Sequence, residues 1–153
     1  MRQLNCLGHA EAQRAVAAVQ AQMEQRGKAG VVAVADPHGE LIALLRLDGA
    51  PLGAILIASN KAWTAARERR PSKEIGQGAR DPVTGFNVAY YGDSRYLGWG
   101  GGLPVWANGE VVGAVAVRGL PEAEDMELAQ IGAAAALAPA AAASAGVTGA
   151  TLD

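Results

Sequence analysis

Cysteine, histidine and aromatic residues are all scarce in this chain of 153 residues. A single cysteine, Cys6, excludes an internal disulfide framework and any metal site built from several thiolates. The two histidines, His9 and His38, have no metal-ligand partner at a defining spacing, so we interpret both as exposed structural residues and predict no metal centre. Only 5% of the residues are aromatic although 50% are hydrophobic. The apolar content is mainly Ala, Val and Leu, which suits helices packed closely on a sheet.

An excess of charge and long apolar runs are also absent. Lys and Arg total 13 against 15 Asp and Glu, a net charge of −2, whereas nucleic-acid-binding proteins normally carry a basic excess. No apolar run reaches the ~18 residues of a membrane span, and MRQLNCLGHAEAQ at the N-terminus lacks the continuous apolar stretch of a signal peptide, so we expect none. The Gly-x-Ser-x-Gly motif, which carries the nucleophile of many serine hydrolases, is also absent, so the sequence gives no support for a serine hydrolase. We expect one cytoplasmic domain over 1–153 (core about 10–137, Ala/Gly-rich tail 139–153), without nucleic-acid or membrane partners.

The predicted elements follow the order helix, hairpin, helix, irregular segment, hairpin, helix. Apolar residues at helical spacing predict the helices, and turn chemistry predicts the hairpins: Asp-Pro-His-Gly suits a type I turn, and Asn-Gly is the strongest two-residue hairpin signal. A short helical piece near 73–77 fits the pattern, and 86–90 is predicted as a short strand. We expect helices at about 10–25, 51–68 and 122–137, and hairpins from 31–35 with 40–47 and from 103–107 with 110–117.

Three consecutive glycines follow Trp99 in the stretch GDSRYLGWGGGLPVWANGE, residues 92–110. Ordering glycine costs conformational entropy, so such a run inside a folded segment needs a reason. A phosphate-binding loop requires a helix directly after its glycines, but a strand follows here, which rejects a nucleotide site. The glycines are instead predicted to let the backbone turn tightly beside the second helix. The surrounding segment, 78–102, has no periodicity, and such long loops are often functional.

The second predicted helix carries groups that could bind an anion. Lys61, Thr64 and Glu68 fall at i, i+3 and i+7 on one face. A cation and a hydroxyl in the middle of the helix could bind a carboxylate, and Arg46 could contribute to the same pocket. The helix also has a small-residue face that permits close packing (Ala58, Ala62 and Ala65) and an end that we interpret as solvated charge (Arg69 and Arg70).

Six short segments are each weak indicators of a family, but their combination in this order is specific. They are VVAVADPHGEL (31–41), RLDGA (46–50), KAWTAA (61–66), GGLPV (101–105), GAVAVRG (113–119) and DMELA (125–129). Together they resemble the GlcG/HbpS-like family, also called the haem-degrading family and related to the C-terminal domain of PduO-type proteins. The resemblance spans about residues 10–137. It implies a three-layer, profilin-like α/β sandwich in which helices cover an antiparallel sheet of about five strands, assembled into a homo-oligomer.

The resemblance implies, as a first function, binding of haem or a similar planar anionic ligand between the second helix and the Gly-Gly-Leu-Pro-Val strand. Haem-binding relatives use a basic residue near the Lys-Ala-x-Thr-Ala helix for the propionates, which here is Lys61 or Arg67. His9 could supply the axial ligand. The residues expected to contact the ligand are Lys61, Thr64, Arg67, Trp99, Gly101, Gly102 and His9.

Departures from the family pattern suggest an enzyme as the alternative. Val-Arg-Gly at 117–119 replaces the usual Val-Ser-Gly, and DSRYLGW at 93–99 looks like a subgroup found with aromatic-ring catabolism. The reaction would be isomerisation, hydration or hydrolysis of a small unsaturated oxo-carboxylate, with Asp93 as general acid or base. Arg118, Arg95 or Lys61 would hold the carboxylate, and the amides of Gly101 and Gly102 would face a developing oxyanion. A third interpretation makes Asp93 and Arg95 a loop salt bridge and packs the tryptophans at an oligomer interface.

Overall fold

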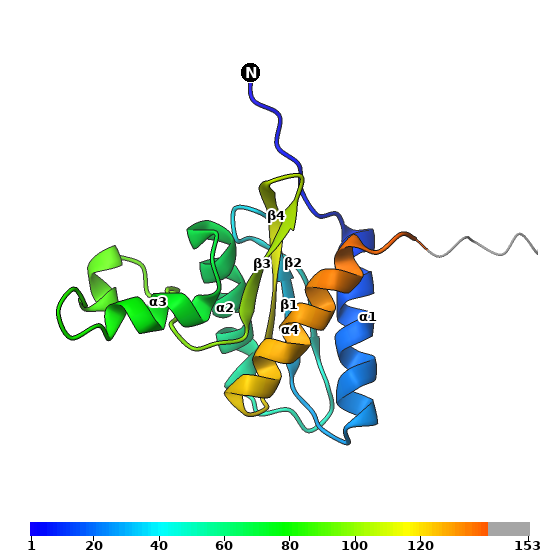
Figure 1. Ribbon diagram of the computed structural model, residues 1–153. Helices are drawn as coiled ribbons and strands as arrows, with labels where there is room; N and C mark the ends of the chain where they lie inside the picture. The colour runs from blue at the N-terminus through cyan, green and yellow to red at the C-terminus, as the bar shows by residue number, and fades with distance from the viewer. Residues whose placement is uncertain (141–153) are drawn as a thin grey trace, which may run out of the picture.

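The computed structural model describes residues 1–140, so most of the predicted tail at 139–153 lies outside the described residues. Its centre is one antiparallel sheet with the strand order β2-β1-β4-β3 (Figure 1). Both predicted hairpins are present, and they join through the pairing of β1 with β4. The strands are β1 (Val31–Ala35), β2 (Leu41–Arg46), β3 (Gly102–Ala107) and β4 (Glu110–Arg118).

The sheet has four strands rather than about five. The predicted strand at 86–90 is wrong: Val88–Tyr91 forms the 3-10 helix η1. The Asn87 side chain accepts a hydrogen bond from Ala89 N at 3.0 Å, and Gly92 closes the turn with a φ of 75°. Asparagine side chains offer the backbone this local alternative to strand pairing, which outweighs the aromatic character of the segment.

Helices cover both faces of the sheet, giving three layers. Helices α1 (His9–Gln25) and α4 (Glu122–Leu137) pack on one face, and α2 (Ala54–Glu68) packs on the other (Figure 1). Strand β1 is buried on both sides: Val32 and Val34 face the pair of helices, and Ala33 and Ala35 face α2. The alternation of strand side chains thus puts Val32 and Val34 under two helices and Val31, Ala33 and Ala35 under one.

The small-residue face of α2 is used for packing within the protomer. Ala58, Ala62 and Ala65 are fully buried, and they meet alanines of β1 and β4. The neighbouring Trp63 is 4% exposed, so it packs inside the protomer rather than at an oligomer interface. Trp99 and Trp106 keep about half of their surface exposed.

The irregular segment between α2 and β3 projects from the body as an arm (Figure 1). Helix α3 (Ser72–Ala79) begins after Pro71 and extends the short helix predicted near 73–77. The arm then returns to the body and delivers the glycine run to the start of β3. Within residues 1–140, no helix combines the length and apolar character that crossing a membrane requires.

Candidate functional site

Lys61 lies in the middle of α2 and is completely buried. Its Nζ donates to the carbonyl oxygen of Val117 at 2.9 Å and to Oδ2 of Asp125 at 3.1 Å. Asp125 is also fully buried, and its Oδ1 accepts a hydrogen bond from Leu120 N at 3.1 Å. Burial lowers the pKa of Lys61 and raises the pKa of Asp125. This ion pair ties α2 to the end of β4 and the start of α4.

The region predicted as a ligand pocket, between α2 and the Gly-Gly-Leu-Pro-Val strand, is filled by protein. Thr64 Oγ1 donates to Arg95 O and accepts from Leu97 N, both at 3.1 Å. A Cβ at Gly102 would lie 2.4 Å from the Lys61 carbonyl oxygen, and one at Gly101 would lie 2.8 Å from Lys61 Nζ. The glycines therefore allow the close approach to α2 that the sequence predicted. The cavity that Gly101 and Gly102 do line, of about 80 Å³, is bounded by residues of α3 and α4 and not of α2.

Two polar residues that sequence reasoning missed fix the glycine run. Ser72 Oγ accepts a hydrogen bond from Gly102 N at 2.9 Å and donates to Trp99 O at 2.6 Å. Glu122 Oε1 accepts from Gly100 N at 2.7 Å, while its Oε2 lies 2.8 Å from Lys73 Nζ. One indication of these two roles was visible in the sequence: Ser72 and Glu122 each directly follow a proline and stand at the start of a predicted helix.

Asp93 and Arg95, two of the three predicted catalytic residues, form an ion pair in the loop. Arg95 donates from Nε to Asp93 Oδ1 at 3.1 Å and from Nη2 to Oδ2 at 2.8 Å. These bonds lower the pKa of Asp93 to about 2. A general acid or base works best with a pKa near the operating pH, so this carboxylate is poorly matched to either role near neutrality. The geometry agrees with the interpretation as a loop salt bridge.

The remaining predicted residues are dispersed over the surface. The Arg118 guanidinium stacks 5.0 Å from the centre of the Trp99 ring and lines a cavity of about 170 Å³ at the start of α2. Arg46 is exposed at the end of the edge strand β2. His9, the first residue of α1, is exposed and lines none of the four cavities described among residues 1–140.

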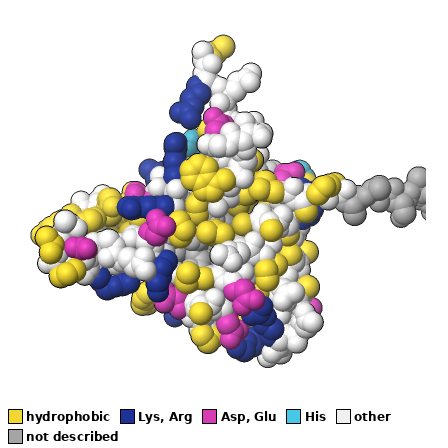
Figure 2. All heavy atoms as spheres, viewed as in Figure 1, with side chains coloured by type: hydrophobic (Ala, Val, Ile, Leu, Met, Phe, Trp, Pro, Cys, Tyr) yellow, Lys and Arg dark blue, Asp and Glu magenta, His cyan; other side chains and the backbone are white. Residues whose placement is uncertain are grey.

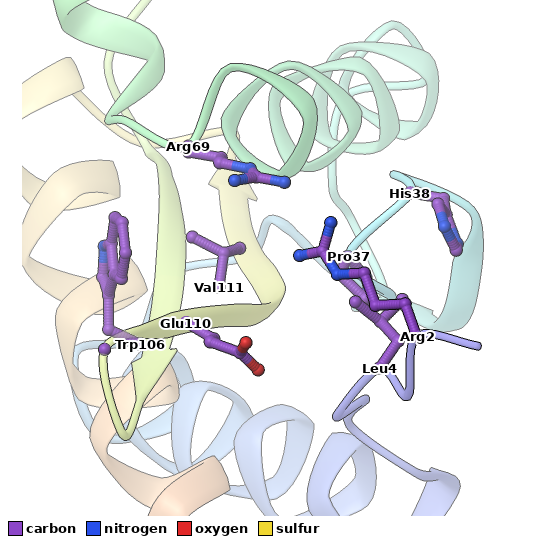
Figure 3. A pocket seen from close by; sticks show the side chains of 9 residues that line it. Arg2, Leu4, Pro37, His38, Arg69, Trp106, Glu110 and Val111 are labelled. Carbon is purple, nitrogen blue, oxygen red and sulfur yellow. The ribbon is translucent and has the colours of Figure 1, made fainter.

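Two adjoining cavities, of about 320 and 260 Å³, lie at the C-terminal end of α2. Both are lined by Pro37, His38 and Arg69; we call them together the arginine groove. Figure 3 shows the larger cavity, where Arg69 lies above Val111. The other residues that line the groove are Arg2, Leu4, Trp106, Gly109, Glu110 and Val111 in the larger cavity and Arg67 and Tyr96 in the smaller.

The arginine groove is predominantly positive. Figure 2 shows basic side chains gathered below the N-terminal segment, on the side of α2. Among the described residues that line the groove, Glu110 is the sole carboxylate against Arg2, Arg67 and Arg69. Neither Arg2 nor Arg69 forms an ion pair with any residue of 1–140. Uncompensated guanidinium groups beside a cavity favour an anionic ligand.

Arg69 owes its position to an uncommon backbone conformation. It caps α2 with φ 56° and ψ 35°, in the left-handed region that usually holds glycine. The helix must end here because Pro71 disfavours helical geometry in the residue before it. Interpreting Arg69 from the sequence as solvated charge captured its exposure but missed that it lines both cavities.

Comparison with known proteins places this chain in a family. A model described as "Haem degrading protein HbpS-like" matches residues 7–134. GlcG of Escherichia coli (strain K12) is 36% identical over 102 residues, which cover 67% of this chain and 73% of GlcG. HbpS of Streptomyces reticuli, solved as a double mutant, is 31% identical with a TM-score of 0.77, covering 88% of this chain and 89% of that one. A complex of PduOC with haem is 24% identical with a TM-score of 0.79, covering 85% and 94%, and supports the fold. The chain belongs to the HbpS-like family.

Proposed function

We propose that this protein binds haem or a similar planar anionic ligand in the arginine groove. The description of its family as haem-degrading supports the class of ligand, and the haem complex of PduOC shows that a protein of this fold holds it. The observation that carries the proposal is that Arg2 and Arg69 line a large cavity without an acidic partner in residues 1–140. Arginine is suited to such a ligand because its guanidinium binds carboxylates in two-point contacts.

The groove residues fit haem in three respects. Arg67 and Arg69 would hold the propionates. Trp106, which is half exposed, and the apolar floor at Val111 offer surface to a planar ring. His38 adds an imidazole. When bound, haem supplies iron-centred chemistry, which its axial ligand and surroundings tune.

This proposal keeps Arg67 from the sequence prediction and moves the site away from Lys61 and Thr64. Lys61 Nζ already donates to Asp125 and Val117, and the Thr64 hydroxyl already bonds to the loop backbone, so both side chains serve internal contacts. Arg67 stands at the edge of the groove, where its guanidinium lies 4.8 Å from the Trp63 ring centre. The homo-oligomer expected from the resemblance stays a prediction that light scattering would test.

Hemin titration followed by the Soret band tests the proposal. We expect a saturable spectral change, with affinity reduced about tenfold in Arg69→Ala because a hydrogen bond to a charged group contributes about 1.5 kcal/mol or more. Arg70→Ala is the matched control: it removes the same charge one residue along the chain, from a side chain that lies 3.7 Å from Glu68 and outside the groove. Absence of saturable binding, or equal losses in both variants, would refute the site.

A further inference from the structure

His38 occupies a turn whose backbone is fixed from two sides. Its N–H donates to Asp36 Oδ1 at 2.8 Å, and its carbonyl oxygen accepts a hydrogen bond from Arg67 Nη1 at 3.2 Å. The next residue, Gly39, has a φ of 92° and packs so closely on Trp63 that a Cβ would lie 2.7 Å from the indole ring. The turn is therefore anchored to α2 through both Arg67 and Trp63.

The imidazole of His38, in contrast, is free. The side chain is exposed and lines both cavities of the arginine groove. Its ring makes no hydrogen bond to another residue in the part of the chain that the structure describes. The backbone of His38 is therefore held in place, and both nitrogen atoms of its imidazole remain available to a ligand in the groove.

Few other groups in the groove could bind a haem iron. Proteins hold haem iron through His, Cys, Met or Tyr, and among the described residues that line the groove these types are represented by His38 and Tyr96. Tyr96 stacks on Tyr91 at 4.2 Å and meets Trp63 edge-on at 4.8 Å. Burial raises its pKa, which disfavours the phenolate that iron requires.

The surroundings of His38 match a ligand with a central metal and carboxylates at its rim. Arg67 donates to the carbonyl oxygen of His38, and Arg69 lines the same two cavities as His38, so one imidazole and two guanidinium groups belong to the same groove. We infer that His38 is the axial ligand of haem, or of a related metalloporphyrin, bound in the arginine groove. This inference rests on the proposed function and adds the residue that would contact the metal.

The chain offers its own control because it has two histidines. His38→Ala is compared with His9→Ala, and hemin is compared with protoporphyrin IX, which has the same carboxylates but no iron. In His38→Ala we expect an altered ferric Soret band and a hemin affinity weaker by about tenfold or more. Mutating a residue that merely hydrogen-bonds to a metal ligand already lowers metal affinity by about tenfold or more, and loss of the ligand itself should have at least that effect. The porphyrin affinity should change less than about twofold, because the contacts of the arginine side chains with the porphyrin carboxylates remain. His9→Ala should match the parent protein with both ligands.

A second variant removes ambiguity about folding. His38→Gly should recover the parent hemin spectrum when free imidazole is added, and thermal unfolding of each variant followed by circular dichroism confirms that it is folded. An unchanged hemin spectrum in His38→Ala, or equal loss of hemin and porphyrin affinity, overturns the assignment of His38 while the haem-binding proposal stands. If the parent protein binds neither hemin nor porphyrin, the proposed function itself fails.

Discussion

Replacing Lys61 by methionine distinguishes a structural from a ligand-binding role for this residue. Methionine has a similar length but no charge, so the substitution leaves the Asp125 carboxylate buried with a single hydrogen bond, from Leu120 N, and leaves Val117 O without its donor. Removing one partner of a buried ion pair costs about 3–5 kcal/mol. Because domains are stable by only about 5–15 kcal/mol, we expect a large loss in the free energy of unfolding.

Urea unfolding followed by tryptophan fluorescence, at one protein concentration, measures this loss. A double-mutant cycle with Asp125→Asn isolates the pair: the asparagine is neutral and still accepts from Leu120 N, so the double mutant should lose about 1–3 kcal/mol less than the sum of the single variants. A loss below about 1 kcal/mol in Lys61→Met, together with weaker hemin binding, would refute the structural role and return Lys61 to the ligand site.

The pH dependence of the same variant gives an independent check. Burial already raises the pKa of Asp125, while Lys61 opposes that increase. Without the lysine the folded-state pKa should rise further above the unfolded value. A group with a raised folded pKa favours the folded state below its unfolded pKa, and that contribution is lost as the pH rises through the folded pKa. The stability difference between Lys61→Met and the parent should therefore narrow as the solution is made more acidic.

Three further substitutions test single features. Gly102→Ala should cost about 1–3 kcal/mol by overpacking against α2, whereas Gly78→Ala, in an open helical position, should be neutral or stabilising; equal urea midpoints would contradict the packing. Arg95→Ala should raise the pKa of Asp93 from about 2 toward about 3.9 in a carbon-detected NMR titration. The ion pair thus favours folding above about pH 4 and loses that effect as the pH falls toward 2; an unshifted Asp93 pKa would show that another group causes the depression. Arg69→Gly should have a free energy of unfolding about 1 kcal/mol higher than that of Arg69→Ala in urea unfolding, because glycine tolerates the left-handed conformation. Equal stabilities of the two variants would mean that the cap at residue 69 is unstrained.

The fold was predictable where the chain encodes it locally. The Asp-Pro-His-Gly and Asn-Gly turns fixed both hairpins, and helical spacing of apolar residues located three helices to within a few residues. The short helix α3 was less evident because Gly76 and Gly78 interrupt its pattern. The error at 86–90 came from ranking residue type above a side-chain cap at Asn87. Likeness to profilin itself stays a prediction.

The role of Lys61 was not predictable by the same means. Its position showed a cation in the middle of a helix, which is compatible with a ligand contact or with a buried partner. That partner, Asp125, lies 64 residues away in the DMELA segment. The two become neighbours because α2 and α4 both pass the end of β4, on opposite faces of the sheet. Such a pairing depends on tertiary packing, which the spacing of residues within one helix does not reveal.

The arginine groove, which we propose as the ligand site, is assembled by the pairing of the two hairpins. Strand β1 ends and β4 begins at the same end of the sheet, since the two strands are antiparallel and Ala35 pairs with Ala114. The turn carrying His38, the turn between β3 and β4, and the end of α2 consequently meet there, and Arg2 reaches the same end of the sheet from the N-terminus. These charges are far apart in sequence, and each one alone looks like solvated surface. They become a candidate site only when the antiparallel connection of the two hairpins is taken into account, because that pairing brings the two turns and the end of α2 together.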